Sequence, residues 1–113
     1  NIAITDISAV SHIPDVIEAP YRPALLNESD EGCKVILGGP SCLAGDIIGE
    51  YNFNSLPKVG DRIALLDQAH YTMVKTSFFN GVKIPSVAIW DSDNDNLEVI
   101  KNFTYEDFEN KLS

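Results

Sequence analysis

The sequence predicts a mainly β fold, a β-barrel or β-sandwich decorated with short helices. Three observations lead to this prediction. Six or so apolar segments have the length of strands, turn-forming Gly, Pro, Asn and Asp residues separate them, and the clearest helix signal lies near the end of the chain. The 113 residues contain no internal repeat, and 44% of them are hydrophobic, which suits one domain with its own core.

The first part of the chain combines one expected strand with irregular segments. Apolar and polar residues loosely alternate over residues 2–10, as they do in a half-buried strand. A short helical turn should begin at Pro14, because proline suits the first turn of a helix. Pro20 and Pro23 then exclude a regular helix, so residues 21–26 should be extended.

The middle of the chain has the pattern of strands joined by turns. Residues 27–32 are polar and predict a turn, and the apolar run at residues 33–37 predicts the next strand. We expect another strand over residues 46–53. The Pro and Gly residues of the segment 57–61 predict a turn, and a further strand should follow over residues 62–66.

The last third of the chain predicts a hairpin between two helices. Residues 71–78 are compatible with a short helix. The apolar segments 86–90 and 97–100 flank the polar segment 91–96, which is typical of a β-hairpin. A capping box, Ser/Thr-x-x-Asp/Glu, opens the segment at about 104–112, where we expect a terminal helix.

The composition of the chain restricts its partners. Eight Lys and Arg residues stand against 17 Asp and Glu residues, and the net charge of -9 disfavours nucleic acid and favours cationic ligands such as amines. No apolar run is long enough to span a bilayer and no secretory signal is visible, so we expect no membrane partner and a cytoplasmic location. Because no His, Cys, Asp or Glu residues have metal-ligand spacing, no metal site is predicted.

Cys42 is the first candidate for chemistry. It follows the Gly38-Gly39-Pro40 corner and precedes Asp46, so we expect its thiol at an exposed loop tip. A cysteine is more often a small buried apolar residue. An exposed neutral thiol delivers a proton, and a thiol beside a base acts as a nucleophile; the pattern allows both roles.

A second loop, residues 69–81, carries His70 and Tyr71 at its start and closes with an Asn-Gly pair. Tyr71 would ordinarily bury its ring and leave its hydroxyl in water; alternatively, the hydroxyl binds a phosphate. His12 and His70 are the only histidines, and each is expected to bond locally. Two such loops on a rigid base are a common way of presenting catalytic groups.

Six segments carry a family resemblance: Cys42-Leu43-Ala44-Gly45-Asp46, Ala69-His70-Tyr71-Thr72-Met73-Val74-Lys75-Thr76, His12-Ile13-Pro14-Asp15-Val16, Pro20-Tyr21-Arg22-Pro23, Phe79-Asn80-Gly81 and Tyr105-Glu106-Asp107-Phe108. They resemble the fold-type III, pyridoxal-phosphate-dependent decarboxylases, which include ornithine, arginine and diaminopimelate decarboxylases. The finer resemblance is to the carboxynorspermidine/carboxyspermidine decarboxylases of bacterial polyamine (spermidine) biosynthesis, and it covers nearly the whole chain.

The resemblance implies that residues 1–113 are the carboxyl-terminal β-barrel domain of a longer enzyme. The amino-terminal (β/α)8 barrel, which holds most of the pyridoxal 5'-phosphate site in that family, is absent from this chain. The β-domain would complete the active site across a homodimer interface. Cys42 would return a proton to the substrate carbon after carbon dioxide leaves, and Tyr71 would bind the cofactor phosphate. The fragment by itself is expected to be inactive.

The resemblance implies roles for further residues as well. Asp46 and Phe79 would lie at the dimer interface, where Asp46 would pair with a cation of the other subunit. The candidates for contacts to a polyamine-like substrate are Glu18, His12, Asp15 and Arg22.

Two departures from the family pattern bear on the substrate. Leu43 stands where ornithine and diaminopimelate decarboxylases have an acidic residue, which favours a longer and more apolar substrate. Leu26 replaces the tyrosine that accompanies the arginine in diaminopimelate decarboxylases. The predicted reaction is therefore decarboxylation of carboxynorspermidine or carboxyspermidine. The alternatives are a diaminopimelate- or ornithine-type decarboxylase, a non-catalytic decarboxylase-like regulatory protein, and an unrelated β-barrel binding protein.

Overall fold

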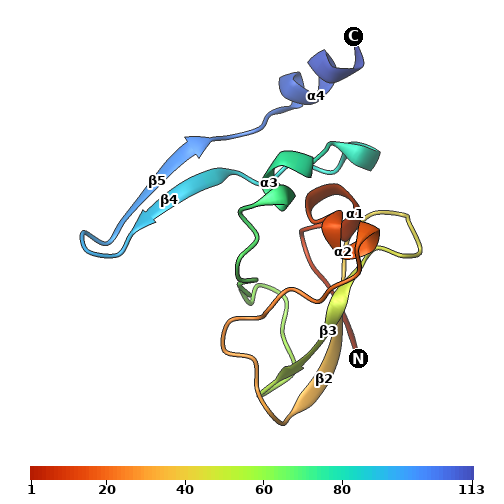
Figure 1. Ribbon diagram of the computed structural model, residues 1–113, viewed down its shortest axis with the longest axis vertical. Coiled ribbons are helices and arrows are strands. Elements are labelled where there is room, and N and C mark those ends of the chain that lie inside the picture. The colour runs from red at the N-terminus through yellow and green to blue at the C-terminus, as the bar shows by residue number, and fades with distance from the viewer.

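The computed structural model describes residues 1–113 as two small sheets and several short helices (Figure 1). In chain order the elements are β1 (Ile2–Ile4), α1 (Ala9–His12), α2 (Asp15–Glu18), β2 (Cys33–Gly38), β3 (Ile47–Phe53), α3 (Tyr71–Lys75), the 3-10 turn η1 (Phe79–Gly81), β4 (Val87–Asp91), β5 (Asn96–Lys101) and α4 (Tyr105–Leu112). None of the helices has the length and apolar character needed to span a membrane.

The first sheet has the strand order β1-β2-β3. β1 runs parallel to β2, with Ile2 opposite Ile36, and β3 runs antiparallel to β2, with Tyr51 opposite Val35. β4 and β5 form a separate antiparallel hairpin. The predicted combination of small sheets and short helices is confirmed. The closed barrel or sandwich stays a prediction, because the two sheets share no strand pairing.

The core lies against one face of the first sheet. Val35 and Leu37 of β2 are both buried, since alternate side chains of a strand point to the same face. Tyr51 of β3 is 1% exposed, and its hydroxyl donates to the carbonyl oxygen of Pro23 at 2.7 Å, so the buried phenol is satisfied. The other members of the cluster are Ala9, Leu25 and Ile48.

The strand predicted over residues 2–10 is wrong beyond β1. The hydroxyl of Thr5 donates to the carbonyl oxygen of Ile7 at 2.7 Å, which stabilises a turn. The hydroxyl of Ser8 then caps α1 by accepting the N–H of Ser11 at 3.2 Å. Local bonds from side chain to backbone therefore compete with the strand and start a helix in its place.

The strand predicted over residues 62–66 is also wrong. The segment makes only an isolated bridge, between Leu25 and Leu65. Its neighbour in space is the segment around Leu25, in which Pro20 and Pro23 lack the N–H groups that a longer ladder needs.

The other predicted elements are confirmed, with shifted ends. β2 extends the predicted strand 33–37 by one residue, β3 lies within the predicted strand 46–53, and the helical turn after Pro14 is α2. The helix predicted over 71–78 is shorter, because α3 ends at Lys75 and η1 follows. The hairpin is β4–β5. The terminal helix is α4, which the capping box of Thr104 and Asp107 begins.

The β4–β5 hairpin projects from the body formed by the first sheet, α1, α2 and α3 (Figure 1). Every residue of β5 is exposed, and Trp90 and Leu97 are more than half exposed. The radius of gyration is 15.1 Å, whereas a compact domain of this length has a value of about 13 Å. The hairpin therefore presents apolar side chains outside the core.

Candidate active site

Cys42 lies in the loop that joins β2 to β3, and its side chain is exposed. Backbone hydrogen bonds close this loop: the N–H of Gly39 donates to the carbonyl oxygen of Asp46 at 2.8 Å, and the N–H of Asp46 donates to that of Leu43 at 3.0 Å. The expectation of an exposed thiol on a cornered loop is confirmed.

Asp46 is the polar centre of this region and is only 4% exposed. Its Oδ1 accepts hydrogen bonds from the N–H groups of Ala9 at 2.6 Å and Val10 at 3.3 Å, at the start of α1. Its Oδ2 accepts the N–H of Ser41 at 3.0 Å, and the hydroxyl of Ser8 lies within bonding distance of both oxygens. The carboxylate thus binds N–H groups that have no partner within the helix and ties α1 to the cysteine loop.

The environment of Asp46 favours its charged form. Burial alone would raise the pKa of Asp46, but the hydrogen bonds from Ser41, Ser8 and Val10 outweigh burial and lower the pKa. The stabilising effect of the carboxylate is therefore present above about pH 4, the pKa of aspartate in an unfolded chain, and is lost as the pH falls through the lowered pKa. Asp46 thus accepts hydrogen bonds from Ser8, Ala9, Val10 and Ser41, and its ion pair with a cation of another subunit stays a prediction.

The second loop is anchored to α1 by Ser11, which is fully buried. The hydroxyl of Ser11 donates to the carbonyl oxygen of Phe79 at 3.1 Å, and its carbonyl oxygen accepts the N–H of Ser77 at 2.8 Å. The side-chain N–H of Asn80 donates to Cys42 Sγ at 2.9 Å. α1 therefore holds both loops, which brings Cys42 and Asn80 together.

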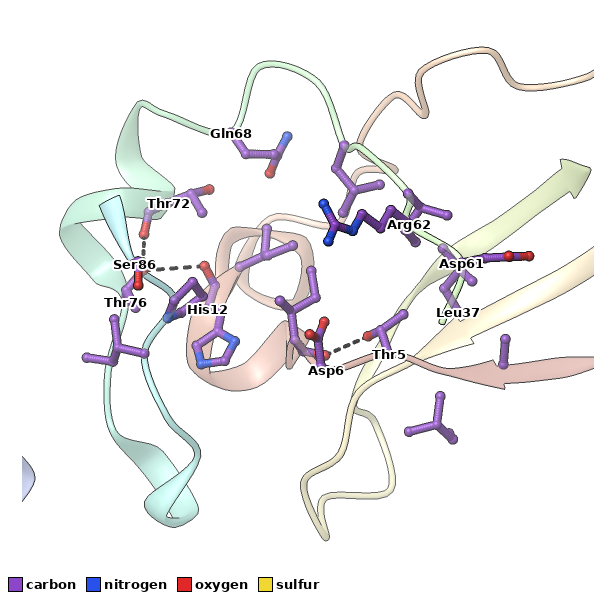
Figure 2. A pocket seen from close by; sticks show the side chains of 18 of the residues that line it. Thr5, Asp6, His12, Leu37, Asp61, Arg62, Gln68, Thr72, Thr76 and Ser86 are labelled. Carbon is purple, nitrogen blue, oxygen red and sulfur yellow. Dashed lines mark hydrogen bonds between the residues drawn. The ribbon is translucent and has the colours of Figure 1, made fainter. Parts of the chain in front are cut away.

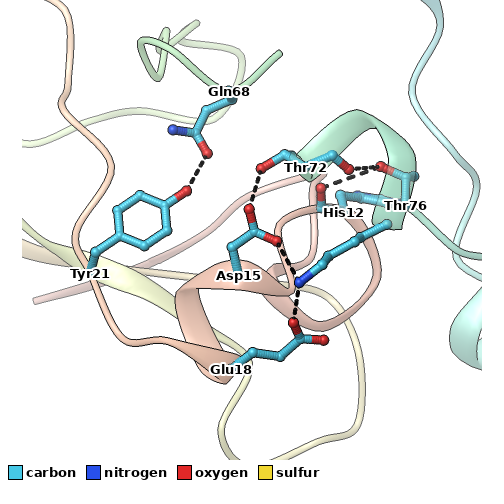
Figure 3. A network of polar contacts seen from close by, with 8 residues as sticks. His12, Asp15, Glu18, Tyr21, Gln68, Thr72 and Thr76 are labelled. Atoms are coloured by element: carbon cyan, nitrogen blue, oxygen red, sulfur yellow. Dashed lines mark hydrogen bonds and ion pairs between the residues drawn. The ribbon is translucent and has the colours of Figure 1, made fainter. Parts of the chain in front are cut away.

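Tyr71 lies at the start of α3 and is 74% exposed. Lys75, one helical turn further, pairs with Glu18 and, at 3.7 Å, with Asp15. The hydroxyl of Thr72 donates to Asp15 Oδ2 at 3.3 Å (Figure 3). The two predicted substrate-binding carboxylates, Asp15 and Glu18, thus lie together beside α3. Both form ion pairs with the ammonium group of Lys75.

Arg22 has a different environment from these carboxylates. Its guanidinium pairs with Glu28 at 2.8 Å and lies 4.5 Å from the centroid of the Tyr51 ring. These contacts attach Arg22 to β3, whereas Asp15 and Glu18 contact α3. The structure therefore does not bring the four predicted substrate-binding residues into one cluster.

His12 is buried, and its Nδ1 accepts the N–H of Ser8 at 3.0 Å, whereas its Nε2 has no hydrogen-bond partner. It lines a cavity of about 1180 Å³, together with Thr72 and apolar residues of β1, β2 and the segment before β4 (Figure 2). Neither Cys42 nor Tyr71 lines this cavity. No group of three or more His, Cys, Asp or Glu side chains is placed to hold a metal ion.

The buried His12 gives a prediction about pH. Burial lowers the pKa of His12, and the backbone of Lys83 and the negative charges of Asp46 and Asp6 offset only part of this effect. The unfolded chain, in which the pKa is about 6.5, therefore takes up the proton first. We expect the free energy of unfolding to fall as the pH is lowered from about 7.5 to about 5.5, which urea titrations at the two pH values measure.

The matched variants are His12→Asn and His70→Asn. Asparagine Oδ1 can replace Nδ1 as the acceptor for the N–H of Ser8, but it does not titrate. His12→Asn should therefore reduce the pH-dependent decrease in the free energy of unfolding. His70→Asn replaces an exposed histidine and should leave that decrease unchanged. An equal fall in both variants contradicts this account of His12.

The contacts of Ser8, Ser11 and Asn80 were not predicted from the sequence. Ser8 lies in the segment interpreted as a strand, although a serine three residues before a potential helical N–H is a typical cap, and Ser11 follows directly after that segment. The Asn-Gly pair at residue 80 favours a left-handed backbone and so indicated a sharp turn. No local signal identified Cys42, 38 residues away, as the partner of Asn80.

Comparisons with known proteins show that the chain is similar to part of several decarboxylases. No family model matches it. A carboxynorspermidine/carboxyspermidine decarboxylase of Campylobacter jejuni is 40% identical over 121 residues, which cover 95% of this chain and 31% of the relative. A carboxyaminopropylagmatine decarboxylase of Synechocystis sp. is 43% identical over 113 residues, which cover 97% of this chain and 29% of the relative. The chain is a homologue of these decarboxylases.

Solved structures agree with this homology. The crystal structure of the Campylobacter jejuni carboxynorspermidine decarboxylase complexed with norspermidine matches with a TM-score of 0.90 and 37% identity, over 97% of this decarboxylase homologue and 34% of that chain. An SrLDC mutant in complex with PLP has a TM-score of 0.61 at 24% identity, over 74% of this chain and 22% of that one, which shows the fold alone. The homologue spans about three tenths of the length of the curated relatives it matches.

Proposed function

We propose that this chain is part of a pyridoxal-phosphate-dependent carboxy-lyase that converts carboxynorspermidine or carboxyspermidine to norspermidine or spermidine, with the Cys42 thiol as the acid. The observation that carries the proposal is the exposed Cys42 on a loop that the buried Asp46 carboxylate holds in place. The names of the relatives support the reaction class. A fixed loop suits an acid, because proton transfer requires a defined position beside the reacting carbon.

Two exposed donors of this chain fit the cofactor. Bound pyridoxal phosphate supplies an electron sink for the pair of the bond to the departing carboxylate. Cys42 then holds a proton for the carbon that has lost the carboxylate, and the exposed Tyr71 hydroxyl is suited to donate a hydrogen bond to the phosphate. Neither Cys42 nor Tyr71 lines the cavity of this chain. We therefore propose that residues outside these 113 form the rest of the cofactor site.

A second subunit completes the site in this proposal. Phe79 is 48% exposed beside Asn80, and Ile89, Trp90 and Leu97 of the hairpin are more than half exposed. Apolar side chains exposed together are typical of a surface that another protein surface covers. We therefore propose that these side chains take part in the intersubunit contacts.

The substrate proposal is supported by the residues beside the two loops. Leu43 is 46% exposed next to Cys42, so an apolar side chain, and not a carboxylate, neighbours the proposed acid. Asp15 and Glu18 already hold the Lys75 ammonium, and their spacing therefore suits an amine. An ammonium group of a polyamine would replace Lys75 at these carboxylates.

The test is the activity of the full-length enzyme on carboxynorspermidine, carboxyspermidine, carboxyaminopropylagmatine, diaminopimelate and ornithine. We expect the highest kcat/KM on one of the first two. The highest value on diaminopimelate or ornithine would contradict the substrate proposal, and no decarboxylation of any compound would favour a regulatory protein. Carboxyaminopropylagmatine is the second candidate substrate, because the Synechocystis relative of that name is 43% identical to this chain.

A further inference from the structure

Asn80 contacts the sulfur of Cys42 across a gap of 38 residues in the sequence. Its Nδ2 lies 2.9 Å from Cys42 Sγ, which is within hydrogen-bonding distance of sulfur. An amide NH2 group only donates, so the sulfur is the acceptor in this contact. The contact is exposed and joins two loops whose bases are buried.

The backbone of η1 is shaped to make this contact. Asn80 has a φ of 62° and Gly81 a φ of 69°, so two successive residues adopt the left-handed conformation. For an L-residue this conformation costs about 1–2 kcal/mol, although asparagine tolerates it better than most. The bond from Ser11 to the carbonyl oxygen of Phe79 holds the turn in place.

We propose that Asn80 is a positioning residue for Cys42: its amide donates to Sγ, directs the thiol hydrogen away from η1 and stabilises the thiolate left after proton delivery. This inference rests on the proposed role of Cys42 as the acid. In that step the S–H bond breaks and its electron pair stays on sulfur. The new C–H bond uses the electron pair of the broken C–C bond, which stays behind when carbon dioxide leaves. A hydrogen bond donated to the sulfur therefore stabilises the thiolate more than it stabilises the thiol.

Two variants of the full-length enzyme distinguish the effect of the Asn80 side-chain amide from the effect of the backbone conformation at this residue. Asn80→Gly keeps access to the left-handed conformation and removes the amide. Asn80→Asp keeps the shape and replaces the donor by an acceptor. Asn27→Gly is the matched control, because Asn27 is an exposed asparagine with a φ of 58° in another turn.

The first readout does not depend on catalysis. Iodoacetamide alkylates the thiolate, and mass spectrometry follows Cys42, with Cys33 of the same chain as the internal reference. We expect both Asn80 variants to slow alkylation of Cys42 about tenfold at neutral pH, because a hydrogen bond to a charged group is worth at least that factor. Asn27→Gly should leave the rate unchanged. Unchanged alkylation in both Asn80 variants overturns the proposal.

The second readout is a double-mutant cycle in turnover. We expect each Asn80 variant to lower kcat about tenfold with little change in KM, and Asn80→Gly to cause no further loss in the Cys42→Ala background. An additional tenfold loss in that background, or unchanged kcat in both Asn80 variants, overturns the positioning role. Full activity of Cys42→Ala alone would instead refute the proposed function, while the alkylation rates still decide whether Asn80 stabilises the thiolate.

Discussion

Cys42→Ala in the full-length enzyme should lower kcat by roughly 100- to 10,000-fold, the range that a positioned general acid contributes. In the proposed function the exposed Cys42 thiol donates the proton, and alanine offers no proton in its place. KM should change little, because the thiol acts on the reacting carbon after the substrate has bound. Steady-state decarboxylation assays measure both constants.

The products of Cys42→Ala distinguish proton delivery from a structural effect. Without the acid at this position, a larger share of turnovers should end in carbonyl by-products of misplaced protonation, which chromatography separates from the polyamine. Cys33→Ala is the matched control, because Cys33 lies on β2, where it pairs with Phe53 of β3. Wild-type kcat in Cys42→Ala would make Cys42 a structural residue.

Gly39→Ala should lower the free energy of unfolding by about 3 kcal/mol. A Cβ at residue 39 would stand 2.4 Å from Asp46 Oδ2, closer than such atoms approach in proteins. The carboxylate would have to move, and it would then lose charge-assisted bonds from Ala9 and Ser41, each worth about 1.5–3 kcal/mol. Urea denaturation of the variant and the parent measures the difference.

Gly45→Ala is the control for this experiment. It lies in the same loop, and a Cβ at residue 45 meets nothing within 4 Å. Neither Gly39 nor Gly45 has a positive φ, so alanine brings no left-handed strain at either site. Equal stability of the two variants would mean that the cysteine loop is not built around Asp46.

Local signals predicted those parts of the fold whose contacts are close in sequence. The capping box that begins α4 joins Thr104 to Asp107, only three residues apart, and the β4–β5 hairpin closes over a short polar turn. The apolar run at 33–37 forms a strand in which the alternate residues Val35 and Leu37 are buried. In each case the sequence pattern and the stabilising contact lie in the same segment.

The candidate site depends on contacts that no local pattern encodes. Asp46 meets Ala9 across 37 residues, and Asn80 meets Cys42 across 38. The alternation of residues 2–10 resembles a strand, yet bonds of Ser8 and Asp46 start α1 within it. The sequence therefore predicted the exposure of the Cys42 thiol, but not the helix that joins the two loops.

The most direct test of the central claim is a crystal structure of the full-length enzyme with pyridoxal phosphate and norspermidine bound. We predict that Cys42 Sγ lies about 3.5 Å from the norspermidine carbon that corresponds to the decarboxylated centre, a distance that permits proton transfer. The Asn80 contact to sulfur should persist. A Cys42 sulfur that faces away from the bound amine, with another acidic group beside that carbon, would contradict the account.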